Sequence, residues 1–212
     1  VEVFGKNVDA NTYETKLDLG IVPQEVNFGL FEKVFDICVT QGGYYGLPRK
    51  IAEERSEKYL KKLGLWDKKD QQARNLSGGM KRRLLIAKAM VHQPPILVLD
   101  EPTAGVDVEL RKNLWDNVKE LNNQGVTIIL TTHYLFEAQE MCDRIAIIDK
   151  GNLIALDTTQ KMIDRIQTKK VKFKVEKIPK NENLNLEGIQ FIVNSNNNIT
   201  AIYEKNSHDF ED

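Results

Sequence analysis

Cysteine is scarce in this sequence, whose 212 residues contain only Cys38 and Cys142. Two cysteines this far apart cannot build a disulfide framework or a zinc cluster, so we expect two reduced thiols in packed helices. Long apolar runs are lacking too, because no stretch approaches the roughly 18 residues that are needed to cross a bilayer. The chain also opens without the basic and then apolar pattern of a signal peptide. A function at a membrane would therefore require a partner.

An excess of charge of one sign is the third thing that is missing. The chain has 30 Lys and Arg against 31 Asp and Glu, which gives a formal net charge of -1. This balance offers no general attraction for nucleic acid, and we interpret the basic stretch at residues 169–174 as a solvated strand face. With 41% hydrophobic and 29% charged residues, the chain suits one globular domain with a smaller appendage.

What the sequence does contain is an alternation of strand and helix patterns. It indicates strands at residues 1–5, 17–22, 96–99 and 126–130, the last two being apolar enough for strands buried on both faces. Helices are expected from residue 30 to about 64, with breaks at Gly42-Gly43 and before Pro48, and at about residues 78–92, 107–125 and 134–141. The alternation predicts a layered α/β fold around a parallel sheet.

The C-terminal part has a different texture. Strands are expected at residues 144–148 and 153–156, then at 171–175, 189–193 and 199–203, and a helix start at residues 210–212. We predict a main domain over residues 1–168, with a helical subdomain at about 30–92, and a partial α+β accessory domain over 169–212. Because the opening strand has no earlier element to pair with, we expect the chain to be a piece of a longer one.

Polar residues follow three of the expected strands. Gln24 comes after the strand at residues 17–22, Asp100 and Glu101 come after the strand at 96–99, and His133 comes after the strand at 126–130. Each has an ordinary explanation when taken alone, such as a loop glutamine or a structural histidine. Because ligands bind beyond the carboxyl ends of strands in open α/β sheets, the three together predict one site for metal or phosphate chemistry.

The loop Leu76-Ser77-Gly78-Gly79 opens a predicted helix and is a second candidate. Its glycines let a ligand approach the backbone, and the free N–H groups of a first helical turn attract anions. Lys81, Arg82 and Arg83 follow, where cations oppose the helix dipole. We interpret them as part of an anion site; a solvated basic face, with Ser77 as a simple helix cap, is the alternative.

These segments resemble ABC ATPases, in this order and spacing. Residues 76–79 are similar to the signature loop, residues 96–101 to the Walker B strand and residues 102–107 to the D-loop. Gln24 matches the Q-loop glutamine and His133 the switch histidine. The segment at residues 41–46, Met80 and the C-terminal appendage resemble type-2 exporters of the multidrug or polysaccharide efflux kind.

The resemblance implies an ATP-hydrolysing subunit that uses ATP and Mg²⁺. Such a subunit would pair with an integral-membrane permease and a second ATPase subunit, and would lie in the cytoplasm on the inner face of the cell membrane. The groove for the permease would lie in the helical region at residues 30–91. By this resemblance Glu101 would be the general base, and Asp100 with Gln24 would bind Mg²⁺. His133 would contact the γ-phosphate. The residues that would bind the nucleotide of the opposite subunit are Ser77, Gly78, Gly79 and Asp107.

One part of the family pattern is missing from these residues. No G-x-x-x-x-G-K-[ST] occurs, and Gly5-Lys6 is followed by Asn7, so the cradle for the β- and γ-phosphates is absent. We expect truncation to be the reason, since Glu101 and His133 are retained. The alternatives are a non-hydrolysing or regulatory half that supplies only the signature loop, and an ABC ATPase without a transport role.

Overall fold

The computed structural model describes residues 1–8, 13–104, 106, 108–164, 168–174, 189–194 and 198–204. Contacts divide the chain into two compact units, Val1–Glu137 and Ala138–Asp212, which we call unit 1 and unit 2. This division falls earlier than residue 168, where the sequence places the domain boundary, and that boundary stays a prediction.

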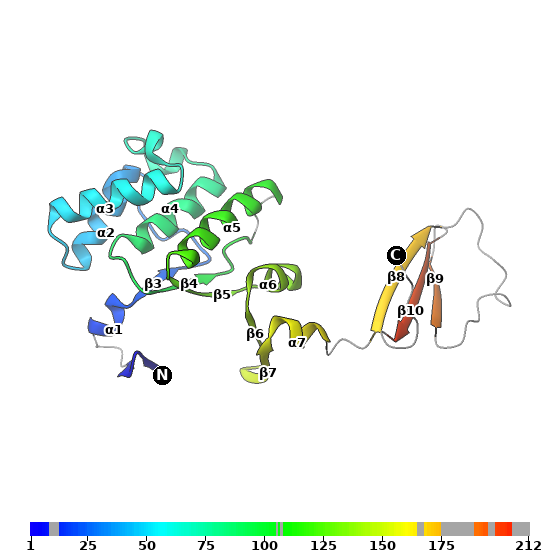
Figure 1. Cartoon of the computed structure of the whole chain (residues 1–212). Coiled ribbons are helices and arrows are strands. Elements are labelled where there is room, and N and C mark those ends of the chain that lie inside the picture. Colours follow the sequence, from blue (N-terminus) through cyan, green and yellow to red (C-terminus); the bar gives the residue numbers. More distant parts are fainter. Residues whose placement is uncertain are drawn as a thin grey trace. The chain divides into compact units, whose positions relative to one another are not determined.

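The centre of unit 1 is a parallel sheet. Strands β3 (Leu19–Val22), β4 (Ile96–Asp100) and β5 (Thr127–Thr131) lie in the order β3-β4-β5 (Figure 1). A helical segment connects β3 to β4, and α5 (Val108–Asn123) connects β4 to β5. The predicted α/β architecture with a parallel sheet is therefore confirmed.

The N-terminal end of unit 1 differs from the prediction. The strand expected at residues 1–5 is a two-residue strand, β1 (Glu2–Val3), which pairs with β2 (Lys6–Asn7) in a hairpin. Its turn lies at Phe4 and Gly5, both with positive φ. The short helix α1 (Tyr13–Leu17) occupies residues before β3, so that strand begins at Leu19 and not at residue 17.

Only one face of this sheet is buried. Leu97 and Leu99 are fully buried, and they lie on the face against which α4 and α5 pack. Ile21 and Ile129 lie on the opposite face and are 61% and 51% exposed. Burial on both faces was therefore wrong for β5, whereas in β4 the second face, with Ile96 and Val98, is half-buried.

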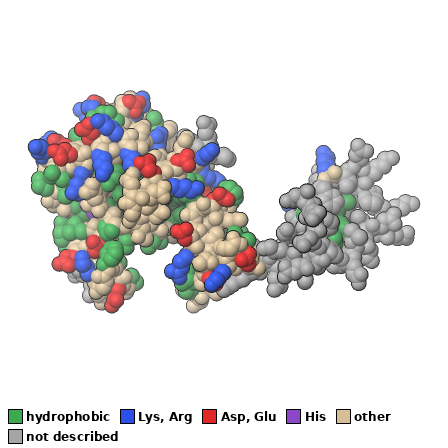
Figure 2. Space-filling model, viewed as in Figure 1, with side chains coloured by type: hydrophobic (Ala, Val, Ile, Leu, Met, Phe, Trp, Pro, Cys, Tyr) green, Lys and Arg blue, Asp and Glu red, His purple; other side chains and the backbone are tan. Residues whose placement is uncertain are grey.

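The helical segment of unit 1 packs α2 (Val34–Tyr44) and α3 (Arg49–Lys62) with α4 (Gly78–Met90). Two short 3₁₀ helices, η1 (Trp66–Lys68) and η2 (Ala73–Asn75), link α3 to α4. Ala52, Tyr59 and Leu60 of α3 are buried, at the spacing of one helix face. Figure 2 shows basic and acidic side chains intermingled over the visible face of this segment.

The predicted break at Gly42-Gly43 is wrong, because α2 runs through both glycines and ends at Tyr44. A Cβ atom at Gly42 would lie 2.7 Å from the Cβ of Ala52 in α3 and 3.1 Å from Val91. The glycine therefore serves close helix packing instead of ending the helix. The expected break before Pro48 does occur.

Helix α5 is amphipathic, with apolar residues at positions 110, 114, 118 and 121. Leu114, Val118 and Leu121 are buried, and Gly125 follows the helix with a φ of +93°. The side chain of Leu110 lies outside the described part. Helix α6 (Leu135–Met141) begins shortly after β5. Within the described residues, no helix combines the length and apolar character needed to span a membrane.

Unit 2 contains two small sheets and a short helix. Strands β6 (Arg144–Asp149) and β7 (Asn152–Thr158) form a hairpin, whose turn residues Lys150 and Gly151 both have positive φ. Helix α7 (Thr159–Asp164) follows. The strands expected beyond it are confirmed as an antiparallel sheet in the order β8-β10-β9, and residues 210–212 lie outside the described part. Its strands are β8 (Thr168–Lys174), β9 (Ile189–Asn194) and β10 (Asn198–Glu204).

Candidate functional site

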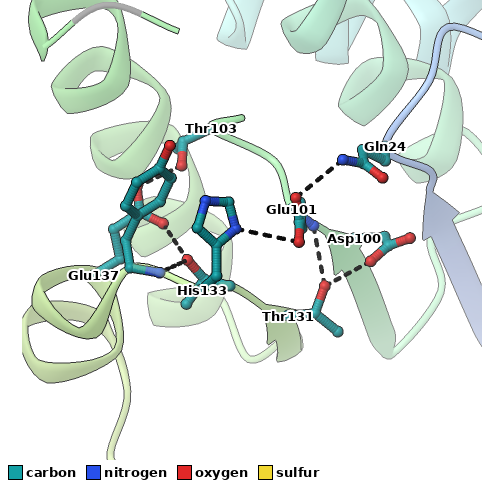
Figure 3. A network of polar contacts seen from close by, with 9 residues as sticks. Gln24, Asp100, Glu101, Thr103, Thr131, His133 and Glu137 are labelled. Atoms are coloured by element: carbon teal, nitrogen blue, oxygen red, sulfur yellow. Dashed lines mark hydrogen bonds and ion pairs between the residues drawn. The ribbon is translucent and has the colours of Figure 1, made fainter. Parts of the chain in front are cut away.

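The carboxyl ends of β3, β4 and β5 meet at one edge of the sheet. Parallel pairing places Val22 beside Leu99 and Asp100 beside Thr131, so the residues that follow these strands lie close together. Figure 3 shows Gln24, Asp100, Glu101 and His133 gathered there. The convergence predicted from the three strand ends is confirmed.

The Glu101 carboxylate is the centre of this cluster. Its Oε2 accepts a hydrogen bond from Gln24 Nε2 at 3.0 Å, and its Oε1 lies 3.2 Å from His133 Nδ1. The Glu101 side chain is 30% exposed and that of His133 is 56% exposed. The carboxylate is therefore bracketed by two polar groups and remains open to solvent.

The backbone of Glu101 is held in an unusual conformation. Its φ is +42°, in the left-handed region that non-glycine residues rarely adopt. The Glu101 N–H donates to both the carbonyl oxygen and the Oγ1 of Thr131, at 3.2 and 3.1 Å. Backbone strain of this kind concentrates at functional sites, where the surroundings fix it.

Thr131 also orients the second carboxylate. Its hydroxyl donates to Asp100 Oδ1 at 2.6 Å while it accepts from the Glu101 N–H, so one side chain is bonded to both acidic residues. Thr131 was not predicted as a site residue. It is the last residue of β5, and only the pairing register of the two strands places it opposite Asp100.

The donor set fits Mg²⁺. In the part of the chain that the structure describes, Asp100 Oδ2 has no hydrogen-bond partner, and Gln24 donates through its nitrogen, so an oxygen of each remains for a cation. Throughout the described residues, no group of three or more His, Cys, Asp or Glu side chains could hold a metal ion. Mg²⁺ is commonly bound by one or two carboxylates together with water and substrate phosphates, and this sparse set agrees with that mode.

The loop at residues 76–79 is built differently. Ser77 is the N-cap of α4, and its Oγ accepts a hydrogen bond from Met80 N at 3.3 Å. A Cβ added to Gly78 would contact nothing within 4 Å, so the first turn is open to an approaching ligand. Asp107, the remaining candidate, lies outside the described residues.

Two of the basic residues after this loop have structural partners. Arg82 donates to the Pro23 carbonyl at 3.2 Å, and Arg83 donates to the Leu63 carbonyl at 2.8 Å. These contacts with backbone oxygens are a structural reason for the position of Arg82 and Arg83 in the first turns of α4, and the anion site stays a prediction. The Arg82 contact joins α4 to the segment that carries Gln24.

Comparison with known proteins identifies relatives of this chain. The ABC transporter family profile matches residues 1–104. The chain is 37% identical over 166 residues to the linearmycin resistance ATP-binding protein LnrL of Bacillus subtilis, covering 78% of this chain and 53% of that protein. It is 36% identical over 160 residues to the Nod factor export ATP-binding protein I of Cupriavidus metallidurans, covering 76% and 53%. The chain thus spans about half the length of these relatives.

Solved structures agree on the fold. The structure of cbiO1 from Clostridium perfringens, described as part of the ABC transporter complex cbiONQ, matches with a TM-score of 0.68 and 28% identity. That match covers 76% of this chain and 66% of cbiO1. The chain therefore has the α/β fold of an ABC transporter ATP-binding subunit and is related to LnrL and to the Nod factor export ATP-binding protein I.

Proposed function

We propose that this chain belongs to an ATP-hydrolysing subunit that powers export, with Glu101 as the general base. The observation that carries this is the Glu101 carboxylate held between Gln24 and His133, beside Asp100, at the carboxyl ends of three parallel strands. A carboxylate that is fixed and still accessible can orient a water molecule for attack on a phosphorus atom.

The surrounding residues take the supporting roles. His133 contacts the γ-phosphate and supplies hydrogen bonding to the charge that develops on the transferred phosphoryl group. Asp100 and Gln24 would hold Mg²⁺, which would neutralise part of the negative charge that develops on the phosphate groups. Thr131 keeps Asp100 and Glu101 in register by bonding to both.

The loop at residues 76–79 serves a second subunit. Ser77, Gly78 and Gly79 bind the γ-phosphate of the nucleotide in the opposite subunit, and Asp107 crosses the same interface. The open first turn of α4 supports this, since backbone N–H groups at a helix start attract anions. Two nucleotides are then sandwiched in a head-to-tail dimer of identical subunits.

A permease completes the transporter. The exporter relatives and the cbiO1 complex support an integral-membrane partner, which would hold this subunit in the cytoplasm at the inner face of the cell membrane. The export direction, the multidrug or polysaccharide kind of cargo and a separate accessory domain over residues 169–212 belong to the same proposal.

These 212 residues alone should bind ATP with Mg²⁺ very weakly, because they contain no G-x-x-x-x-G-K-[ST] sequence to hold the triphosphate. Isothermal titration calorimetry of this stretch with ATP and Mg²⁺ measures the affinity directly. Binding as tight as that of an intact ABC ATPase would show that the described residues suffice.

The function itself is tested with the full-length protein. We expect it to release phosphate from ATP only when Mg²⁺ is present, and to do so faster with its permease in a lipid bilayer. A full-length protein that binds ATP and forms the dimer without turnover, even with the permease, would instead be a non-hydrolysing half.

A further inference from the structure

A buried carboxylate lies next to the candidate site and has no part in the chemistry described above. Glu137, in the first turn of α6, is only 1% exposed. A buried charge is costly unless it is paired and hydrogen-bonded, so its partners show what holds it in place.

Glu137 has three partners from three different segments. Its Oε1 accepts a hydrogen bond from the Thr103 hydroxyl and lies 3.3 Å from Arg111 Nε in α5, while its Oε2 accepts from Thr132 Oγ1 at 2.8 Å. Thr103 is two residues beyond Glu101, and Thr132 directly precedes His133. One carboxylate thus binds the loop after the candidate base and the loop that carries its histidine partner.

Both loops are fixed further by these contacts. The Thr132 hydroxyl accepts from Tyr134 N at 3.0 Å while it donates to Glu137, so its orientation is set on both sides of His133. The Arg111 guanidinium lies 4.9 Å from the centre of the Tyr134 ring and donates to the Val106 carbonyl. In Figure 3, His133 is seen between Glu101 and the pair Thr103 and Glu137.

We propose that Glu137 is a positioning residue that sets the distance between His133 and Glu101. It touches neither of them and acts through Thr103 and Thr132, so that the 3.2 Å contact of Nδ1 with Oε1 is maintained while nucleotide binds and leaves. This inference rests on the proposed function, because it assigns Glu137 to the same reaction. Glu137 differs from a residue that only stabilises the fold, because its loss changes turnover in molecules that remain folded.

The first test is Glu137→Gln in the full-length protein, which keeps the shape and removes the charge. We expect kcat for ATP to fall about tenfold, which corresponds to one charged hydrogen bond, with KM for ATP unchanged. Glu120→Gln, on the exposed surface of α5, is the matched control and keeps the parent rate. A parent-like kcat in Glu137→Gln, together with a lower melting temperature, overturns the proposal.

Threonine variants keep the test valid if Glu137→Gln does not fold. Thr103→Val and Thr132→Val each remove one hydrogen bond to the Glu137 carboxylate, and each should lower kcat. Thr103→Ser retains the hydroxyl, so its kcat should return to the parent value. Because both act through Glu137, the double variant should lose less than the product of the single effects. Effects that multiply independently contradict the proposal. Thr127→Val, at the other end of β5, is the control.

Hydrogen exchange gives a readout that is independent of catalysis. The amides of residues 131–137 should exchange faster in Glu137→Gln than in the parent, and unchanged exchange overturns the inference. A parent protein without ATPase activity whose Glu137→Gln variant still shows this faster exchange would disprove the proposed function and leave the loop contacts in place. An active parent with an unaffected variant would disprove only the role of Glu137.

Discussion

The strand-end cluster and the loop at residues 76–79 are both candidate phosphate-binding regions, yet they are assembled in different ways. Gln24, Asp100, Glu101 and His133 lie at the ends of three strands. Hydrogen bonds within unit 1, including those of Thr131, join them. The described hydrogen bond of the Ser77 side chain is only to the backbone of its own helix. The first region is therefore organised by this chain alone, whereas the second presents an open helix start whose proposed ligand belongs to another subunit.

This difference determines what each region needs in order to work. A site that is held by internal hydrogen bonds is preorganised, so substitutions there should act on the chemical step. A loop that only caps its own helix should affect function only when a second subunit is present. Substitutions in the two regions should therefore have separable effects on catalysis and on dimerisation.

Glu101→Gln should have the largest effect. In the full-length protein we expect ATP hydrolysis to fall by about 10²–10⁴-fold, the usual contribution of a general base, while ATP binding and the ATP-bound dimer survive. Single-turnover measurements of phosphate release, with nucleotide affinity measured separately, check this. Turnover near the parent rate would exclude Glu101 as the base.

Ser77→Arg should act only through the dimer. Its bulky side chain would occupy the place of the opposite subunit's phosphate, so ATP-driven dimerisation and hydrolysis should be lost while ATP binding to the monomer is retained. Analytical ultracentrifugation with ATP measures the association. If Ser77 only caps α4, the variant loses about 1 kcal/mol of stability and still dimerises.

A mixing experiment sharpens the same contrast. Ser77→Arg subunits are combined with subunits whose phosphate-loop lysine, in the full-length protein, has been replaced. One composite site then carries both defects and the other carries none, so partial ATPase activity should return. Activity that stays absent in a mixture shown to contain heterodimers would argue against action across the interface.

Thr131→Val should have a smaller effect, confined to the strand-end cluster. It removes the hydroxyl that bonds to Asp100 Oδ1 and to the Glu101 N–H, and we expect kcat to fall about tenfold through the loss of a charged hydrogen bond. The Mg²⁺ concentration needed for half-maximal activity should rise, whereas Thr131→Ser should restore both values. Identical rates for the valine and serine variants would show that the hydroxyl has no such role.

His92 lies near the start of β3, away from the strand-end cluster, and tests stability alone. Its Nε2 donates to the Leu19 carbonyl, its ring stacks on Tyr45, and burial lowers its pKa to about 4. The unfolded chain binds the proton more readily, because its histidine has a pKa of about 6.5. The contribution of His92 to the free energy of unfolding is therefore complete above that pH and is lost as the pH falls toward 4. His92→Phe should remove this part of the pH dependence.

Urea unfolding of the parent and of His92→Phe across that pH range measures the difference. ATP hydrolysis of the variant at neutral pH should match the parent, since His92 does not contact the candidate site. An equal loss of stability in both proteins between these pH values would show that another group accounts for it.

The sequence reveals the strand-end cluster because its logic is topological. Once three apolar strands alternate with helices, parallel pairing brings Gln24, Glu101 and His133 to one edge without knowledge of any side-chain contact. The predicted break at Gly42-Gly43 failed for the opposite reason. A glycine that ends a helix and a glycine that lets two helices touch have the same sequence signature, and only the packing against Ala52 separates them.

The residues that support the site were invisible in the sequence. Glu137 has the appearance of a surface charge on a short helix, and Thr131 that of a strand residue, since neither belongs to a periodic pattern. Their roles depend on contacts with residues more than thirty positions away, at Thr103 and Asp100. Arg82 and Arg83 illustrate the same limit, because their partners are carbonyl oxygens that no sequence pattern marks.

The left-handed backbone of Glu101 sets the stability of this protein against its activity. A non-glycine residue in that region costs about 1–2 kcal/mol, which glycine avoids. Glu101→Gly should therefore relax the backbone while it removes the carboxylate, whereas Glu101→Gln retains the strain. A library selected only for heat resistance would be expected to enrich glycine at this position, and the most robust clones would be inactive ones.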